Sequence, residues 1–143
     1  MTVFTAQNGT MNQVHLNGLN LKGADLRWSN LNDCHFKGAD LSGADFTGAD
    51  LSRCDFTDAN LTGAIFKDAD LTNVVLTGAQ FESGSLESAK LTKCTLVGLN
   101  ARNADLRGAD LGDSKCYNAV FEGSQLDGAK TEQTYGFKLD AAS

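Results

Sequence analysis

Apolar residues recur at every fifth position along almost the whole chain. From Leu16 to Leu126 each fifth residue is Leu or Phe, and only Ala101 and Cys116 depart from this rule. The residue two places before the central position is in most units small, and it is most often Ala. The other three positions are mostly Asp, Asn, Ser, Thr, Lys, Arg or Gly. The pattern therefore predicts one tandem array of five-residue units, each with two inward and three outward residues.

A period of five fits neither regular secondary structure. In an α-helix, at about 100° per residue, successive central residues would drift around the axis instead of forming one stripe. In a flat β-strand an odd period would place successive central residues on opposite faces. A solenoid fits the period if each unit forms one short side and the chain bends between units. Because no unit can bury its own apolar pair, stability must come from the stacking of neighbouring coils.

Units such as residues 39–43 and 49–53 resemble the A(D/N)LXX tandems of the pentapeptide-repeat family. The resemblance implies an all-β fold, a right-handed four-sided (quadrilateral) parallel β-helix solenoid with four units per coil. We therefore expect residues 14–130 to form nearly six coils, about 28 Å long at about 4.8 Å per coil. Residues 1–13 are expected to form an N-terminal cap, and residues 131–143 a C-terminal tail or cap.

A coil of four units places residues twenty apart above one another. Phe36 then lies above Phe56, and Phe46 above Phe66. One face acquires an unbroken column of central leucines: Leu31, Leu51, Leu71, Leu91 and Leu111. At Ala101 the small and large inward residues exchange places, because the preceding small position holds Leu99, so the core volume is preserved.

The composition is that of one acidic domain, with a formal net charge of -6 over 143 residues. No apolar run is long enough to cross a bilayer, and residues 1–13 lack the basic start and apolar stretch of a secretory signal. We therefore expect a cytoplasmic protein. Proline is absent, which suits continuous hydrogen bonding between coils. Most glycines fall in the last position of the unit, where the chain turns and a positive φ costs Gly little.

The cysteines follow the repeat rather than a metal-binding spacing. Cys34, Cys54 and Cys94 occupy the small inward position of one column, which also holds valines, so they act as small hydrophobic residues. Cys34 and Cys54, on adjacent coils, are close enough for a disulfide, whereas Cys94 is two coils beyond Cys54. Buried reduced thiols are the favoured interpretation for a cytosolic protein. The chain contains no CxxC pair, so the sequence does not predict a zinc site.

One outward column contains His15, His35 and Asp55, which together could ligate a metal ion. A flat exposed face supplies neither a pocket nor supporting hydrogen bonds, so two exposed imidazoles in a polar column are the favoured interpretation. Serine and threonine residues have no paired His, and an interior filled by Leu, Phe and Ala leaves no cleft for a substrate. We expect a protein that is not an enzyme and that has no catalytic residues, cofactor or metal.

Aspartates directly before central positions suggest an alternative function. Some proteins of the family imitate DNA and bind type II topoisomerases such as DNA gyrase, and this resemblance makes DNA gyrase a possible partner. The acidic columns concerned are Asp25, Asp45 and Asp105 on one face and Asp50, Asp70 and Asp110 on another. The alternative is that these side chains accept hydrogen bonds from backbone amides at the turns. The first of these faces carries six acidic and three basic residues, and the second carries five and three. The net negative charge of each face is therefore small compared with that of DNA. The sequence contains no basic stripe, which argues against direct binding of nucleic acid.

Outward positions are mostly polar, but a second set of outward residues is apolar. This candidate partner surface consists of Val75, Val97, Tyr117 and Val120. It either binds a protein partner or is covered by the tail, which carries Tyr135, Phe137 and Leu139. A dimer contact is a third possibility, and the chain is expected to be a monomer or an end-to-end homodimer through the C-terminal tail. The sequence favours a non-enzymatic repeat scaffold whose flat faces bind an unidentified protein, with DNA gyrase modulation as the alternative.

Overall fold

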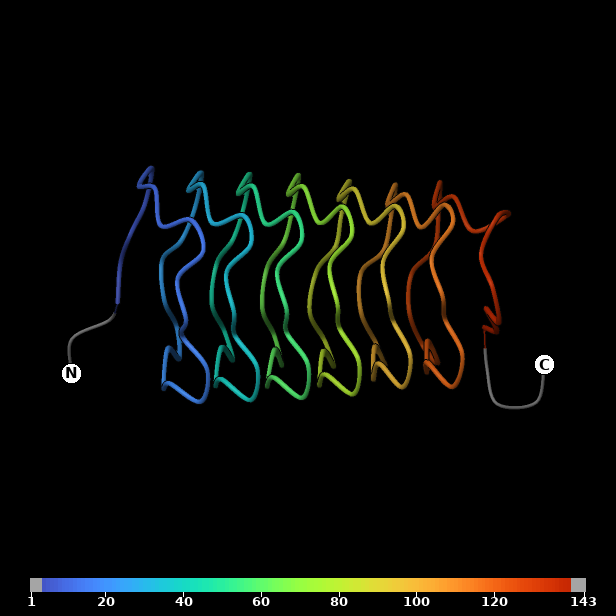
Figure 1. Ribbon diagram of the computed structural model, residues 1–143. Coiled ribbons are helices and arrows are strands. Elements are labelled where there is room, and N and C mark those ends of the chain that lie inside the picture. Colours follow the sequence, from blue (N-terminus) through green and yellow to red (C-terminus); the bar gives the residue numbers. More distant parts are fainter. Residues whose placement is uncertain (1–3, 140–143) are drawn as a thin grey trace.

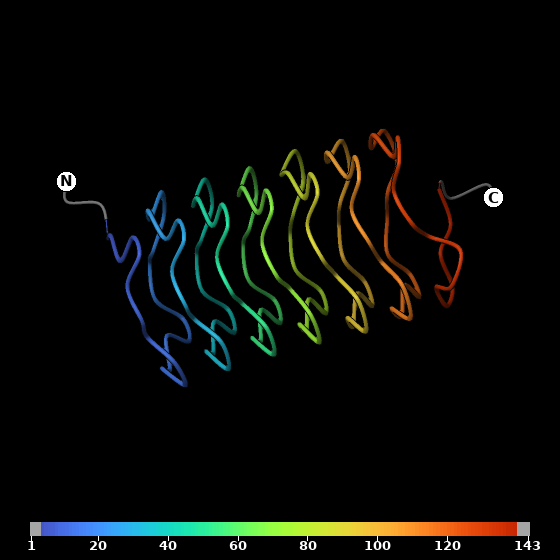
Figure 2. The same cartoon turned by 90° about the horizontal axis from the view of Figure 1, so that it is seen from above.

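The chain is wound into stacked coils of twenty residues. The computed structural model describes residues 4–139. Its backbone pairing consists of 23 parallel bridges, each between residues twenty apart, from Thr5–Asp25 to Lys115–Tyr135. Figure 1 shows the successive coils side by side, and Figure 2 shows from above that the first (blue) and last (red) coils lie at opposite ends. The predicted twenty-residue register is therefore observed.

Each side of a coil contains a single paired residue. Within residues 4–139 there is neither a helix nor a strand of consecutive paired residues, because a turn follows every paired position. The N–H of a central residue donates to the next coil, as from Leu16 to the carbonyl of His35 (2.7 Å). The N–H of the paired residue donates to the preceding coil, as from His35 to the carbonyl of Val14 (2.9 Å). The short sides are thus held together by hydrogen bonds to the neighbouring coils, although no side forms a continuous strand.

Every side ends in a tight turn that needs a positive φ. In the turn after Phe36, the N–H of Ala39 donates to the carbonyl of Phe36 (3.0 Å), and Gly38 has a φ of 67°. The same position has a positive φ in every unit from Asn8 to Gly128. Glycine occupies fewer than half of these positions, and Asn and Asp, which tolerate this conformation, hold many of the others. Trp28, at φ 60°, is the bulkiest residue held there.

The core is a set of vertical stacks along the axis. The rings of Phe36 and Phe56 lie 4.9 Å apart and nearly parallel, and those of Phe46 and Phe66 lie 4.7 Å apart. Neighbouring stacks meet edge to face, as between Phe46 and Phe56 (6.0 Å). The five leucines of the predicted column are completely buried. Leu99 and Ala101 are also buried, which fits the predicted exchange of large and small residues.

Pairing extends beyond the predicted limits of 14–130 at both ends. Thr5 and Thr10 pair with the second coil, so the described part of the predicted 1–13 cap is itself coiled. At the other end Tyr135 still pairs with Lys115, and the ring of Phe137 then packs on Phe121 (4.9 Å). Regular Leu or Phe residues are missing at these ends because a terminal coil has a neighbour on one side only. Residues 1–3 and 140–143 lie outside the described residues. In the described part, no helix is long and apolar enough to cross a membrane.

Candidate partner-binding surface

Two concavities lie near the C-terminal end of the rod. One, of about 490 Å³, is bordered by Arg102, Tyr117, Val120, Phe121 and Lys138. The other, of about 510 Å³, has a polar lining that includes Asp110 and Lys130. The first concavity therefore adjoins two of the four outward apolar residues singled out in the sequence, Tyr117 and Val120.

Two of the four predicted surface residues form a corner column. The N–H of Gly98 donates to the carbonyl of Tyr117 (2.9 Å), which places Val97 and Tyr117 on neighbouring coils at the same corner. Tyr117 is 50% exposed, whereas Val97 is half-buried. Val75 pairs with Thr95, two residues before Val97, and lies one coil nearer the N-terminus.

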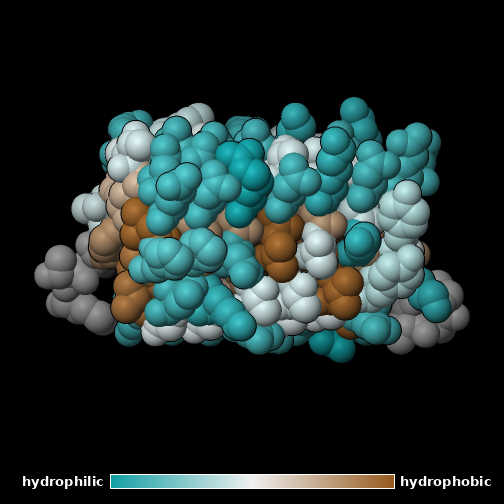
Figure 3. Space-filling view, viewed as in Figure 1, coloured by the Kyte–Doolittle hydropathy of each residue, from teal (hydrophilic) through white to brown (hydrophobic). Residues whose placement is uncertain are grey.

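Val120 lies around the corner, where it pairs with Asn100 and borders the same concavity as Tyr117. The tail reaches this region but does not cover all of it. Gly136 lies against the ring of Tyr117, while Phe137 covers Phe121 at the end of the core. Figure 3 shows apolar areas of one side of the rod as isolated patches among hydrophilic side chains.

The aspartates of the proposed DNA-like columns act as turn acceptors. Oδ1 of Asp45 accepts hydrogen bonds from the N–H (2.9 Å) and the hydroxyl (2.6 Å) of Thr47. Asp50 accepts the same pair from Ser52, and Asp70 from Thr72. Local hydrogen bonding of this kind is what short polar side chains commonly provide at turns. The hydroxyl two residues after the aspartate was not predicted, although the repeated Asp-Leu-Ser and Asp-Phe-Thr sequences contain it.

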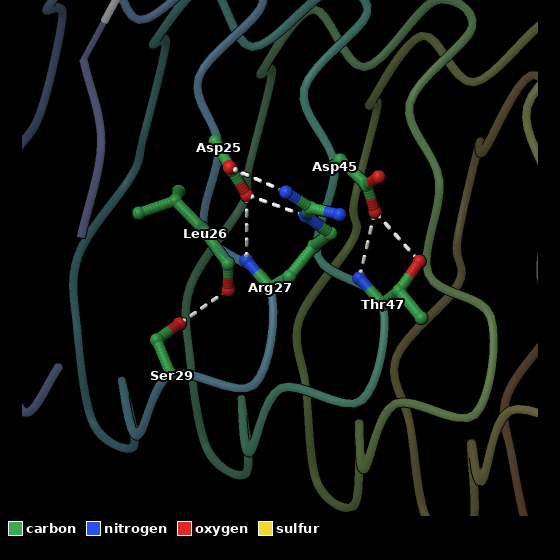
Figure 4. A network of polar contacts seen from close by, with 6 residues as sticks. All are labelled: Asp25, Leu26, Arg27, Ser29, Asp45 and Thr47. Atoms are coloured by element: carbon green, nitrogen blue, oxygen red, sulfur yellow. Dashed lines mark hydrogen bonds and ion pairs between the residues drawn. The ribbon is translucent and has the colours of Figure 1, made fainter. Parts of the chain in front are cut away.

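Two further members of the columns are neutralised by arginine. Arg27 donates from Nε and Nη2 to the carboxylate of Asp25 (2.8 and 2.9 Å), as Figure 4 shows. Arg107 holds Asp105 in the same way (2.8 and 2.7 Å). The hydrogen bonds from Arg27 lower the pKa of Asp25, and those from Arg107 lower the pKa of Asp105.

The acidic columns are also short. Asp50 pairs with Asp70, but Lys90 follows and separates Asp70 from Asp110. Asp25 pairs with Asp45, but Ile65 and Ser85 follow before Asp105. Both columns therefore contain one pair of adjacent aspartates and a third one farther along.

The predicted histidine column contains a stacked pair. The rings of His15 and His35 lie 4.3 Å apart and nearly parallel, and His35 pairs with Asp55 through the backbone. Ring stacking directs the in-plane lone pairs of the nitrogens outward rather than toward a shared ion. Among the residues that the structure describes, no three His, Cys, Asp or Glu side chains form a metal-binding group.

All four cysteines are free and buried. Cys54 donates from Sγ to the carbonyl of Leu31 (2.9 Å), and Cys94 donates to that of Leu71 (2.9 Å), so their thiols bond to the preceding coil. A hydrogen bond with Cys34 and burial raise the pKa of Cys54. Burial raises the pKa of Cys94 to about 12 and that of Cys116 to about 11. The hydrogen bond with Cys54 instead lowers the pKa of Cys34 to about 7. Neutral thiols are poor nucleophiles and poor metal ligands, so Cys54, Cys94 and Cys116 serve packing.

Comparisons with known proteins agree with this architecture. A family model described as "Pentapeptide repeats (8 copies)" matches residues 20–58, 54–92, 85–115 and 104–130. No significant match was found among curated protein sequences.

Two solved structures illustrate the likeness. A pentapeptide repeat protein from the thylakoid lumen of Arabidopsis thaliana is 28% identical, with a TM-score of 0.57 over 80% of this chain and 69% of that one. Trypsin-treated QnrB1, a plasmid-mediated fluoroquinolone resistance protein, is 21% identical, with a TM-score of 0.52 over 89% and 79% of the two chains. With the family match spanning most of its length and the coils in the expected register, the chain belongs to the pentapeptide-repeat family.

Proposed function

We propose that this protein is a non-enzymatic scaffold that binds a protein partner at the corner formed by Val97 and Tyr117. The observation that carries the proposal is the exposed ring of Tyr117, which borders a concavity of about 490 Å³ on the last coil. Aromatic residues beside a pocket are typical anchors of protein interfaces, because they bury a large area at a small entropic cost. Arg102 and Lys138 lie in the same concavity and supply a polar rim.

The rod is suited to presenting such an anchor. Bonds to neighbouring coils fix the backbone on both sides of Val97 and Tyr117, as with the bond from Gly98 to Tyr117. A partner would therefore meet a surface that is already ordered, which reduces the entropy lost on binding. A cytoplasmic location and the absence of catalysis remain part of this proposal.

A second candidate is a DNA-mimicking modulator of DNA gyrase. It is supported by the family resemblance and by the adjacent pairs Asp25–Asp45 and Asp50–Asp70. Phosphates of DNA present one negative charge per about 1.7 Å of axis. Here Lys90 interrupts one column, and Arg27 and Arg107 neutralise two acids of the other. The likeness to QnrB1, at 21% identity, extends to the fold alone. We therefore rank this function second.

Affinity capture with two matched variants separates the candidates. The wild type, V97T/Y117S and D50N/D70N/D110N are immobilised at equal density, after thermal unfolding has shown each to be folded. We expect proteins retained from a cell lysate by the wild type to be lost with V97T/Y117S and kept with the asparagine variant. The reverse pattern would favour the acidic faces, and equal retention by all three would refute a role for the Tyr117 corner.

A further inference from the structure

Within residues 4–139, the outer edge of the first coil has backbone groups without backbone partners. In later coils the N–H of each paired residue donates to the coil before it, as from Asp25 to Phe4 (2.9 Å) and from Asn30 to Gly9 (2.8 Å). The N–H groups of Thr10, His15 and Asn20 point the same way but have no backbone acceptor within residues 4–139. Such an edge is a template for another backbone.

The same end exposes part of the core. Phe4 and Leu19 occupy small inward positions, where the coil above has Ala24 and Ala39. Phe4 is 37% exposed and Leu19 is 46% exposed, whereas both alanines are buried. Three more apolar side chains of this coil are only partly buried: Met11, Val14 and Leu16. At Phe4 and Leu19, large apolar residues thus stand where the repeat most often has Ala.

The end also lacks the charges that usually protect an edge. All 18 acidic residues of the chain lie at or after Asp25, and Lys22 is the only Lys or Arg before it. Proline, another common protection, is absent from the chain. The first coil is therefore close to neutral, while the rod behind it is acidic.

We propose that this N-terminal end docks against the same end of a second copy, giving a two-fold head-to-head dimer. Only another four-sided coil presents paired-residue edges on four sides with the same spacing. Contact between the neutral ends joins two chains of net charge -6 at their least negative surfaces and keeps the acidic coils apart.

A head-to-tail arrangement fits less well. At the C-terminal end the ring of Phe137 covers Phe121, so a second rod cannot continue the stack along the axis. An isologous contact between equal ends also closes the assembly at two copies, whereas head-to-tail contacts would produce open filaments.

The test is the mass of the full chain in solution, measured by light scattering over a concentration series. We expect twice the mass of one chain for the wild type. Leu19→Glu should give the monomer, because it puts a charge into each half of the contact. The matched control is Leu139→Glu, since Leu139 is 48% exposed at the opposite end, and this variant should remain a dimer.

Thr10→Pro provides a second variant that spares the apolar residues. It removes an N–H that has no backbone acceptor in the described chain, so the single rod keeps its bonds while the edge loses a donor. We expect the dimer dissociation constant to rise at least tenfold with an unchanged melting temperature at dilutions where both are monomeric. A monomeric wild type, a series of larger assemblies, or dissociation by Leu139→Glu in place of Leu19→Glu would overturn the proposal.

Discussion

The indole of Trp28 lies against Gly48 on the next coil, where a Cβ atom of residue 48 would stand. Trp28 has a positive φ and is 56% exposed, so this contact supports a residue that its backbone conformation disfavours. Glycine at position 48 is thus favoured by its own φ of 68° and required by the ring of Trp28 on the preceding coil.

Replacing Gly48 with Ala should be more harmful than the same change at Gly43. Both glycines have a φ near 70°, but a Cβ at Gly43 would meet nothing within 4 Å. Gly43→Ala should cost about 1–2 kcal/mol of strain, and Gly48→Ala about 1–3 kcal/mol more from overpacking. Urea unfolding measures the difference, and emission from the single tryptophan should change only in Gly48→Ala. Equal losses with unchanged emission would contradict the contact.

Phe56→Ala should empty the axis of the rod. Phe56 is completely buried, stacks on Phe36 and meets Phe46 and Phe66 edge to face. We expect a loss of about 3–5 kcal/mol in the free energy of unfolding. Chemical denaturation followed by circular dichroism provides the value. Unchanged stability would mean that the side chain does not face the axis.

Asp45 allows the acceptor role of the aspartates to be separated from their charge. Asp45→Ala removes the bonds from the N–H and hydroxyl of Thr47 and should cost about 1–3 kcal/mol, at about 0.5–1.5 kcal/mol for each bond. Asp45→Asn keeps an acceptor oxygen and should stay near wild type. Asn60 already accepts a bond from the N–H of Thr62 in the same way. An asparagine variant as unstable as the alanine one would assign the effect to charge.

Arg27→Met should raise the pKa of Asp25 toward its ordinary value of about 4. The hydrogen bonds from Arg27 lower this pKa in the folded protein. Their contribution to stability is therefore present above the unfolded pKa and is lost as the pH falls through the lowered, folded one. The stability difference between the two proteins should accordingly vanish in strong acid. An NMR titration of the Asp25 carboxyl carbon measures the shift, and identical curves would rule out the ion pair.

The core and its register were predictable because inward positions are tightly constrained. A coil has room for one large and one small residue per side. The fold could therefore be predicted from positions such as Leu31 and Phe56, and even from the exchanged pair Leu99 and Ala101. The ends were less predictable, because Ala6 and Thr131 occupy central positions without the usual Leu or Phe. The contact of Trp28 with Gly48 was not predicted either, because an outward turn position accepts many side chains and the contact depends on how neighbouring coils stack. The residues of the candidate partner surface are also outward, so the fold constrains their identity only loosely.

Gyrase supercoiling tests most directly whether the aspartates serve the turns or imitate DNA. The wild type and D50N/D70N/D110N are titrated into the reaction at low and high salt. Because Asp50, Asp70 and Asp110 bond to their own turns and Lys90 divides their column, we expect no inhibition or protection by either protein at micromolar concentration. Salt-sensitive inhibition by the wild type that disappears in the asparagine variant would contradict this account and establish the acidic face as the functional one.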